Sequence, residues 1–392
     1  MIIYIYQRLF TIYIMKIAFC HDWIYHIGGA EGVFFDLIQK YDKSEYISDI
    51  YTIFSDRKNI NIQGKNYKIH TALPTWLCKI FVYFSKKNII ILSQIFDYRN
   101  LMFWFIPLIY ILSKKINKQN PDLVVISNSA CIKNINIKNS LTRKILYLHS
   151  PLMYIRNHYD DNVMKLKWII KYIYIFIVKF LRPWDLKHRK YNEIFANSQY
   201  TKNICQSIYN FENIKVLYPT IHLAKHQSQN QISFDSLNIP FGSCEYYVYI
   251  GRLVRFSKDL DTIINLFNQN WHKLLIIWSW PDQIYLKSIA KNNIYFGGYI
   301  SDIGAKIRIL QNSKWLTNLT IESFGIITAE AMICGLPVFG YNIWWSKELV
   351  DPKSWILVND KSINNLTTQF EIFDKTKWDS IYISDRAKKM FW

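Results

Sequence analysis

Glycine is scarce in this chain. The 392 residues include 12 glycines and 14 tryptophans, whereas a chain of this length ordinarily carries about 27 glycines. Glycine is the residue that most readily adopts a positive φ and lets other groups approach the backbone. A shortage of this size therefore predicts that some turns lack the residue that suits them.

Closely spaced cysteines are also absent. Six cysteines lie far apart, with no CxxC pair and no Cys/His cluster at metal-ligand spacing. This pattern favours a reduced, cytosolic compartment and argues against a structural disulfide or zinc site. The six are Cys20, Cys78, Cys131, Cys205, Cys244 and Cys334.

No uninterrupted apolar run is long enough to span a bilayer. The first fourteen residues are apolar but contain Gln7 and Arg8, and a spanning helix needs about 20 residues. No small-residue cleavage site follows, which argues against a signal peptide. We expect Met15 to be the true initiator, because Lys16 begins a strand pattern; an interfacial anchor is the alternative.

Acidic residues are in deficit. The chain has 48 basic and 29 acidic residues, a formal charge of +19. That balance favours a polyanionic partner, such as nucleotide phosphates, anionic lipid or nucleic acid. No nucleic-acid motif is present, so we expect no nucleic-acid partner.

Short apolar runs alternate with helical patterns, which predicts an α/β protein with parallel sheets. The length exceeds the roughly 250–300 residues of a single core, and the strand pattern restarts near Tyr246. We therefore expect domains at 15–221 and 241–392, joined by a polar linker at 222–240. The predicted strands are Lys16–Cys20, Ile50–Phe54, Asp122–Ser127, Lys144–Leu148, Glu193–Asn197, Tyr246–Gly251, Lys273–Ile277, Asn293–Phe296, Trp315–Asn318 and Leu336–Gly340.

Two aromatic, lysine-flanked stretches stand out, Cys78–Leu112 and Lys165–Leu181. Charged residues interrupt both. They predict amphipathic helices packed on the first sheet; a basic-aromatic surface that contacts a membrane and admits a lipid-linked acceptor is the alternative.

The strongest motif is the segment Glu322–Glu330. A loop at Glu322–Gly325 should follow a strand, and Ile326–Cys334 should form a helix ended by Gly335. A helix N-terminus directs N–H groups and a positive dipole end outward, which suits a phosphate. The two glutamates would accept hydrogen bonds from sugar and ribose hydroxyls.

This segment resembles the E-x7-E motif of the family-4 glycosyltransferases, which have the GT-B fold of two Rossmann-like domains facing a central cleft. The resemblance covers nearly all of Lys16–Val358. The segments HDW, YxHSP and LRxWD look most like bacterial polysaccharide mannosyltransferases of the O-antigen, lipopolysaccharide type. These three segments are His21–Trp23, Tyr147–Pro151 and Leu181–Asp185. The other segments that carry the resemblance are Gly28–Glu31, Ala196–Ser198, Gly251–Val254 and Lys258.

The resemblance implies a retaining enzyme that needs no metal and no cofactor. It would move a hexose, mannose, from a nucleotide sugar (GDP-mannose) to a glycan or lipid-linked acceptor, in the cytoplasm or on the inner face of the plasma membrane. Attack on the same face, helped by the leaving phosphate, would need no protein nucleophile. The implied catalytic residues are His149, Arg252, Lys258 and Glu322. The implied donor-binding residues are Gly28, Gly29, Ser323, Phe324, Gly325, Ile326, Glu330, Trp344 and Trp345.

The departures from the family share one feature, a tryptophan where glycine is expected. Two adjacent indoles, Trp344 and Trp345, stand where a Gly-Gly loop normally meets the phosphates. We hypothesise that the gene reads UGA as glycine, whereas the written sequence translates UGA as tryptophan. UGG codons at these positions would contradict the hypothesis. A genuinely altered, inactive glycan- or membrane-binding homologue is the alternative. The positions concerned are Trp271, Trp278, Trp280, Trp344, Trp345 and Trp355.

Two weaker patterns have competing interpretations. Asp259-Leu-Asp261 spells DxD, but we expect Asp259 to lie near a helix N-cap rather than on a metal. The loop Gly28–Gly32 does not spell the dinucleotide fingerprint. The segment Asp385–Phe391 resembles the start of the family's last helical segment, which usually continues further, so we expect the final helix to be truncated.

Overall fold

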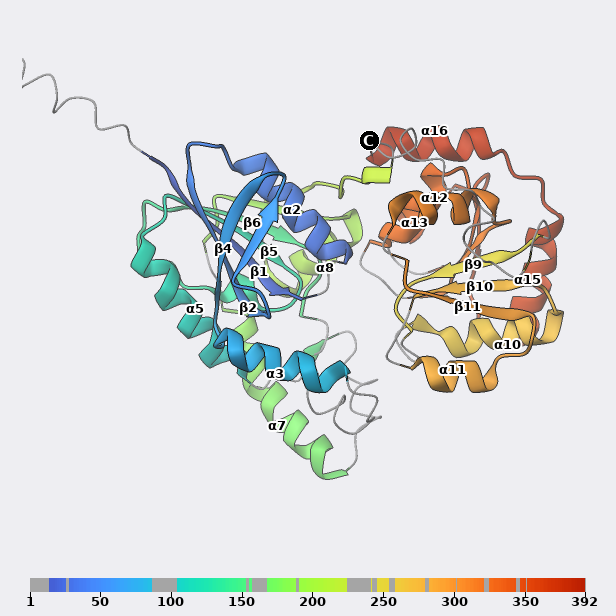
Figure 1. Ribbon diagram of the computed structural model, residues 1–392, viewed down its shortest axis with the longest axis horizontal. Coiled ribbons are helices and arrows are strands. Elements are labelled where there is room, and N and C mark those ends of the chain that lie inside the picture. Colours follow the sequence, from blue (N-terminus) through green and yellow to red (C-terminus); the bar gives the residue numbers. More distant parts are fainter. Residues whose placement is uncertain are drawn as a thin grey trace, which may run out of the picture. The chain divides into compact units, whose positions relative to one another are not determined.

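The computed structural model divides into two compact units, 1–197 with 201–217, and 198–200 with 218–392 (Figure 1). Within them it describes residues 14–25, 28–86, 104–152, 155–156, 168–187, 190–223, 241, 245–253, 258–278, 282–300, 302–320, 324–342, 346–349 and 351–391.

The first unit is built on an eight-stranded sheet of order β3-β4-β2-β1-β5-β6-β7-β8. All neighbouring strands are parallel except β3 and β4, which form an antiparallel pair. The strands are β1 (Lys16–Ile24), β2 (Ile47–Ser55), β3 (Asn59–Ile62), β4 (Lys65–Thr71), β5 (Leu123–Asn128), β6 (Arg143–Leu148), β7 (Glu193–Ala196) and β8 (Ile214–Val216).

Alternation along β1 separates the two faces of this sheet. Ala18 and Cys20 lie in the cluster that α3, α5, α7 and α8 also supply, whereas His21 stacks on Phe34 of α2. Successive strand residues point to opposite faces, so α2 covers one face and the other helices cover the opposite one. The helices are α2 (Gly29–Tyr41), α3 (Thr75–Lys86), α5 (Phe105–Gln119), the 3-10 turn η2 (Ile132–Asn134), α7 (Trp168–Asp185) and α8 (Gln199–Tyr209).

The second unit has an all-parallel sheet of order β11-β10-β9-β12-β13-β14. Its strands are β9 (Tyr247–Ile250), β10 (Leu274–Ile277), β11 (Ile294–Gly298), β12 (Leu316–Asn318), β13 (Val338–Tyr341) and β14 (Trp355–Val358). Its helices are α10 (Leu260–Asn270), α11 (Gln283–Ile289), α12 (Ile303–Asn312), α13 (Ile326–Ile333), α14 (Ser346–Leu349), α15 (Ile363–Lys375) and α16 (Ser380–Phe391).

The order of strands fixes where each unit can hold a ligand. In the first sheet the strand order reverses between β1 and β5, since β2 lies outside β1 and β6 lies outside β5. In the second sheet it reverses between β9 and β12, since β10 lies outside β9 and β13 lies outside β12. Loops leave such neighbouring strands in opposite directions and open a crevice at their carboxyl ends. The residues that follow β1, β5, β9 and β12 therefore lie where a ligand site is expected.

The α/β prediction is confirmed, with two largely parallel sheets. Each predicted strand is present with shifted ends, and the pair β3–β4 and strands β8 and β14 were not predicted. Most of the expected linker, 224–240, lies outside the described residues. In the described part of the chain, no helix combines the length and apolar character needed to cross a bilayer.

Candidate functional site

A hydrogen-bonded chain of three side chains lies at the reversal point of the first sheet. His21 on β1 has its Nδ1 atom 3.0 Å from both the carbonyl oxygen and the Oγ of Ser127 on β5. Ser127 Oγ lies 2.8 Å from Nε2 of His149, which follows β6. All three residues are buried. The predicted catalytic His149 is thus joined to two residues that were not predicted as a site.

The glycine loop is joined to the same chain by Glu31. Its Oε2 accepts the N–H of Gly28 at 3.0 Å, and its Oε1 lies 3.9 Å from Nε2 of His21. Burial opposes ionisation of Glu31, but its interactions with His21 and with the backbone N–H of Gly28 bring the net pKa of Glu31 below its usual value. Gly29 is the first residue of α2. Gly28, Gly29 and His149 are therefore brought to one end of the first sheet.

Burial is also the main influence on His149. Loss of solvent lowers the pKa of His149 well below its ordinary value, and the neighbouring His21 lowers this pKa further. His149 is therefore a neutral imidazole at neutral pH, and its ring also packs edge-on against Tyr147, with the centroids 5.0 Å apart.

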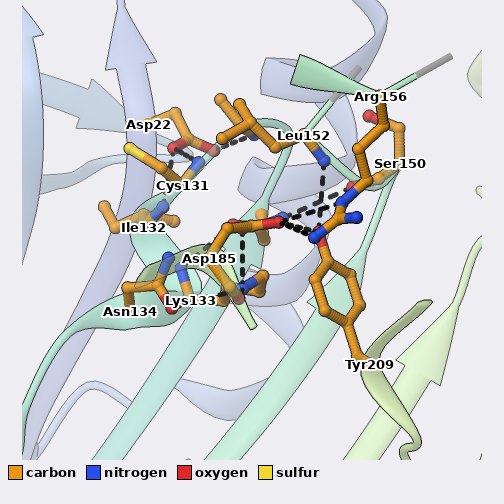
Figure 2. Close-up of polar contacts among 12 residues, drawn as sticks. Asp22, Cys131, Ile132, Lys133, Asn134, Ser150, Leu152, Arg156, Asp185 and Tyr209 are labelled. Carbon is orange, nitrogen blue, oxygen red and sulfur yellow. Dashed lines mark hydrogen bonds and ion pairs between the residues drawn. The ribbon is translucent and has the colours of Figure 1, made fainter. Parts of the chain in front are cut away.

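Asp22, next to His21, fixes the loop after β5. Its carboxylate accepts four backbone N–H groups, from Ser129, Ala130, Cys131 and Ile132, at 2.6–2.9 Å; Figure 2 shows the bonds to Cys131 and Ile132. Four donors on one fully buried carboxylate satisfy a charge that would otherwise be costly. This set of four hydrogen bonds to Asp22, here called the Asp22 clasp, therefore positions the segment directly after Ser127.

A second buried carboxylate, Asp185 at the end of α7, gathers two cations (Figure 2). Lys133 Nζ lies 2.9 Å from Asp185 Oδ1, and Arg156 lies 3.2 Å from Oδ2, which also accepts the Tyr209 hydroxyl at 3.0 Å. Burial lowers the pKa of Lys133, and Asp185 partly opposes this effect. Tyr209 in turn accepts the N–H of Leu152, so the cluster fixes the segment after His149 as well.

The predicted helix of the second unit is present at α13, one residue shorter than expected. Gly325 is its N-cap, with φ +76°, and its carbonyl accepts the N–H groups of Thr328 and Ala329. Gly335 has φ +78°, and a Cβ there would lie 2.7 Å from the Ser380 carbonyl oxygen. Both positions require glycine, and α13 follows β12 at the reversal point of this sheet.

The residues of the motif divide between core and surface. Phe324 is 5% exposed and packs against Tyr218 and Phe391, while Ile326 is partly buried beside the same core cluster. Glu330 forms an ion pair of 2.5 Å with Lys306 on α12. Any ligand hydroxyl bound by Glu330 would therefore share this carboxylate with a cation.

Arg252 follows β9, the strand beside β12, and is exposed. Gly251, just before it, is crowded: a Cβ there would lie 2.8 Å from the Tyr249 hydroxyl. Lys258 lies at the start of the next helical segment. Asp259 is the N-cap of α10, as expected, and its carboxylate forms an ion pair with Lys361.

Two of the suspect tryptophans have backbones that suit glycine. Trp271, at the C-cap of α10, has φ +61°, and Trp278, after β10, has φ +143°. Both values lie in a region that bulky side chains rarely adopt. Trp355 differs, since it lies in β14, is 3% exposed and donates its indole N–H to Met332 Sδ. The hypothesis of miscoded glycine is therefore favoured by the backbone at two positions and not at Trp355.

Several predicted residues lie outside the described part of the chain. They are Glu322, Ser323, Trp280, Trp344 and Trp345.

Sequence reasoning did not assign roles to Ser127, Asp22, Lys133, Arg156 and Asp185. Their partners lie far along the chain: His21 and Ser127 are 106 residues apart. A usable signal existed only for Asp22 and Ser127, which are polar residues at the ends of buried strands beside a sheet reversal.

No family model matches the chain. A curated relative from Klebsiella pneumoniae, an uncharacterized 41.2 kDa protein in the cps region, is 24% identical over 230 residues. That match spans 55% of this chain and 59% of the relative, so less than two thirds of the relative's length is covered.

Solved structures match almost the whole chain. HepE from Anabaena, in complex with UDP and glucose, is 15% identical with a TM-score of 0.60, over 96% of this chain and 99% of that one. WaaG, a glycosyltransferase involved in lipopolysaccharide biosynthesis, is 13% identical with a TM-score of 0.63, over 95% and 93%. Sucrose-phosphate synthase from Thermosynechococcus elongatus is 14% identical with a TM-score of 0.66, over 96% and 95%. The chain has the GT-B fold of these glycosyltransferases.

Proposed function

We propose that this chain is a retaining, metal-independent glycosyltransferase of family 4 that moves mannose from GDP-mannose to a glycan or lipid-linked oligosaccharide. The observation that carries the proposal is the reversal between β9 and β12, where Arg252 and the glycine-capped helix α13 follow neighbouring parallel strands. A cation and a helix N-terminus at such a crevice suit a diphosphate.

The proposed chemistry is stabilisation of a departing diphosphate. Arg252 and Lys258 neutralise the charge that develops on the leaving group, where preorganised positive groups are most effective. Gly325 allows the phosphate to approach the N–H groups of α13, and Glu330 accepts the ribose hydroxyls. Glu322 orients the sugar. For His149, Gly28 and Gly29 of the first unit, we propose the ligand-binding roles that the family resemblance implies. The acceptor oxygen attacks on the face from which the diphosphate leaves.

The comparisons support the class of donor. A structure similar to this chain contains UDP-glucose, so a nucleoside diphosphate sugar fits the fold. The relative encoded in a cps region supports a role in cell-surface polysaccharide synthesis. The choice of guanine and mannose rests on the resemblance of the HDW, YxHSP and LRxWD segments.

The test is a donor survey on protein with glycine restored at five of the six suspect tryptophans, all except the buried Trp355. Hydrolysis or transfer from GDP-mannose should exceed that from UDP-glucose and the other common donors. Arg252→Ala should lower kcat by about 100-fold or more, as for loss of a transition-state partner. Lys375→Ala, which removes an exposed cation at the end of α15, is the control. No turnover with any common GDP- or UDP-sugar would overturn the proposal.

An inactive glycan- or membrane-binding homologue is the second candidate, favoured by the tryptophans themselves. It predicts no heat of binding when GDP or UDP is titrated into either the tryptophan or the glycine form. Nucleotide binding that appears only in the glycine form would support the enzyme.

We further propose that the first unit contacts an anionic membrane surface from the cytoplasmic side. The outer faces of α3, α5 and α7 carry large aromatic side chains that are more than half exposed, with exposed cations Lys79, Lys114 and Lys179 between them. Aromatic residues interleaved with lysines suit the headgroup region of an anionic bilayer. The aromatic residues are Trp76, Tyr83, Trp104, Tyr110, Tyr172, Phe176 and Phe180.

Sedimentation with vesicles tests this surface. Vesicles containing phosphatidylglycerol should bind the protein, and pure phosphatidylcholine vesicles should bind it less. Replacing Phe176 and Phe180 together by Ser should weaken binding about 10-fold or more, since each buries an aromatic ring in lipid. The control is Ile381→Ser, because Ile381 is 75% exposed on α16 of the other unit. Equal effects of the two changes, or no vesicle binding, would contradict the proposal.

A further inference from the structure

The hydrogen bonds around Ser127 determine which ring nitrogen of His149 carries a proton. His21 Nδ1 lies 3.0 Å from the Ser127 backbone carbonyl oxygen. A carbonyl oxygen can only accept, so His21 Nδ1 must carry a hydrogen. The same N–H also reaches Ser127 Oγ at 3.0 Å, and the hydroxyl oxygen is therefore an acceptor towards His21.

The hydroxyl hydrogen of Ser127 then has one destination. Among the described residues, Nε2 of His149 at 2.8 Å is the only further group within its hydrogen-bond distance. Ser127 is fully buried, and a buried hydroxyl hydrogen without an acceptor is costly. Ser127 therefore donates to His149 Nε2, which must be unprotonated.

A neutral imidazole with an unprotonated Nε2 carries its hydrogen on Nδ1. The neutral state follows from the burial of His149 and its proximity to His21, both of which lower its pKa. The groups that face this cluster are His21 on β1, Glu31 on α2 and Tyr147 on β6. Glu31 Oε1 lies 3.9 Å from His21 Nε2.

We infer that His21 and Ser127 are positioning residues that hold His149 as the Nδ1–H tautomer, so that His149 offers a hydrogen-bond donor, and neither a cation nor a general base, to the substrate. The inference rests on the proposed function for the identity of the substrate oxygen, a sugar hydroxyl or a phosphate oxygen. Its chemical content, the tautomer, does not depend on that function.

The tautomer is measured by nitrogen-15 NMR of the full chain labelled at histidine, without any donor. His149→Gln assigns the His149 signals by their loss. In the wild type, Nδ1 should show the shift of a protonated ring nitrogen and Nε2 that of an unprotonated one. A protonated Nε2 in the wild type would overturn the inference.

Two variants test the positioning residues, each with a matched partner. Ser127→Ala removes the donor to Nε2 and should give a mixture of tautomers, whereas Ser129→Ala, which removes a buried hydroxyl without a hydrogen-bond partner, should leave the tautomer unchanged. His21→Leu should likewise give a mixture, and His21→Asn, whose amide can place an N–H where Nδ1 was, should preserve it. An unchanged tautomer in Ser127→Ala contradicts the inference even if the His21 variants fail to fold.

Activity gives a second readout that a purely structural role would not produce. The amide nitrogen of Asn overlays Nδ1 of histidine and that of Gln overlays Nε2, so His149→Asn should retain about 10-fold more kcat/KM than His149→Gln, the value of one hydrogen bond. If His149 is the Nδ1–H tautomer but the protein turns over no donor, the proposed function is contradicted and the inference is supported. If the protein turns over a donor but His149 is the Nε2–H tautomer, the inference is contradicted and the proposed function is supported.

Discussion

The two units hold their candidate site residues in different ways. In the first unit, the buried side chains of Asp22, Asp185 and His21 each form polar contacts with residues far away in the sequence. In the second, the site depends on helix ends and glycine positions, and two of the turns contain tryptophan at positive φ. The first unit therefore depends on side-chain contacts across long sequence separations, whereas the second has two turns whose backbone fits glycine better than tryptophan.

The largest expected effect distinguishes buried from exposed charge pairs. Asp185→Asn leaves Lys133 and Arg156 without a counter-charge, and breaking such a buried pair should cost about 3–5 kcal/mol. Glu330→Gln, in the partly exposed pair with Lys306, should cost no more than about 1 kcal/mol. Urea unfolding followed by hydrogen exchange assigns each loss to its unit; equal losses would show that the two units are alike in this respect.

The next effect concerns a carboxylate that accepts backbone N–H groups. Asp22→Asn replaces one oxygen by an NH2 group that faces donors, and it should destabilise the first unit by about 3 kcal/mol. Asp302→Asn in the second unit retains an N-cap oxygen for Ala305 and should change stability by only a few tenths of a kcal/mol. The free energies come from the same unfolding curves. An Asp22→Asn protein as stable as the wild type would contradict a stabilising role for the Asp22 clasp.

The third prediction has the opposite sign. Trp271→Gly should stabilise the second unit by about 1–2 kcal/mol, because it relieves a left-handed backbone at an exposed site. Trp278→Gly should gain less, since its ring also packs edge-on against Tyr299. Trp315→Gly, a buried strand position, should cost about 3–5 kcal/mol. Thermal unfolding measures all three, and destabilisation by Trp271→Gly would count against miscoded glycine.

The smallest effect is a pH dependence in the first unit. Below its ordinary pKa of about 6.5, His149 binds a proton when unfolded but not when folded, because its folded pKa is lowered. Stability should therefore fall as the pH drops from about 6.5 towards the folded pKa, by about 1 kcal/mol over the first unit of pH. The difference in stability between pH 7.0 and pH 5.5 should be smaller in His149→Asn than in the wild type. An equal difference in both proteins would contradict the assignment of this pH dependence to His149.

The fold was largely accessible from the sequence because buried parallel strands are continuous apolar runs, as at Leu123–Asn128. The hairpin β3–β4 was not, since Asn59–Ile62 and Lys65–Thr71 alternate with polar residues and the turn at Gln63 and Gly64 lacks an Asn-Gly signal. Helix α13 was predicted nearly to its ends because Gly325 and Gly335 mark them.

The candidate site was accessible only in part. His149 and Gly28 could be proposed from local motifs, but the connection between them through Ser127, His21 and Glu31 joins two strands of the sheet and helix α2. Asp185 likewise meets Lys133 from 52 residues away. Such pairings depend on strand order, and no local pattern of charge or hydropathy records that order.

The four hydrogen bonds of the Asp22 carboxylate also limit when this part of the nascent chain can fold. Its four N–H donors lie 107 to 110 residues downstream, which at the usual pace of synthesis is a delay of about 5–20 s. During that interval β1 can pair with β2, but its other edge awaits β5 and its carboxylate has no donors. An ionised aspartate resists burial until the ribosome has delivered its partners, so the charge delays premature closure of this edge of the sheet.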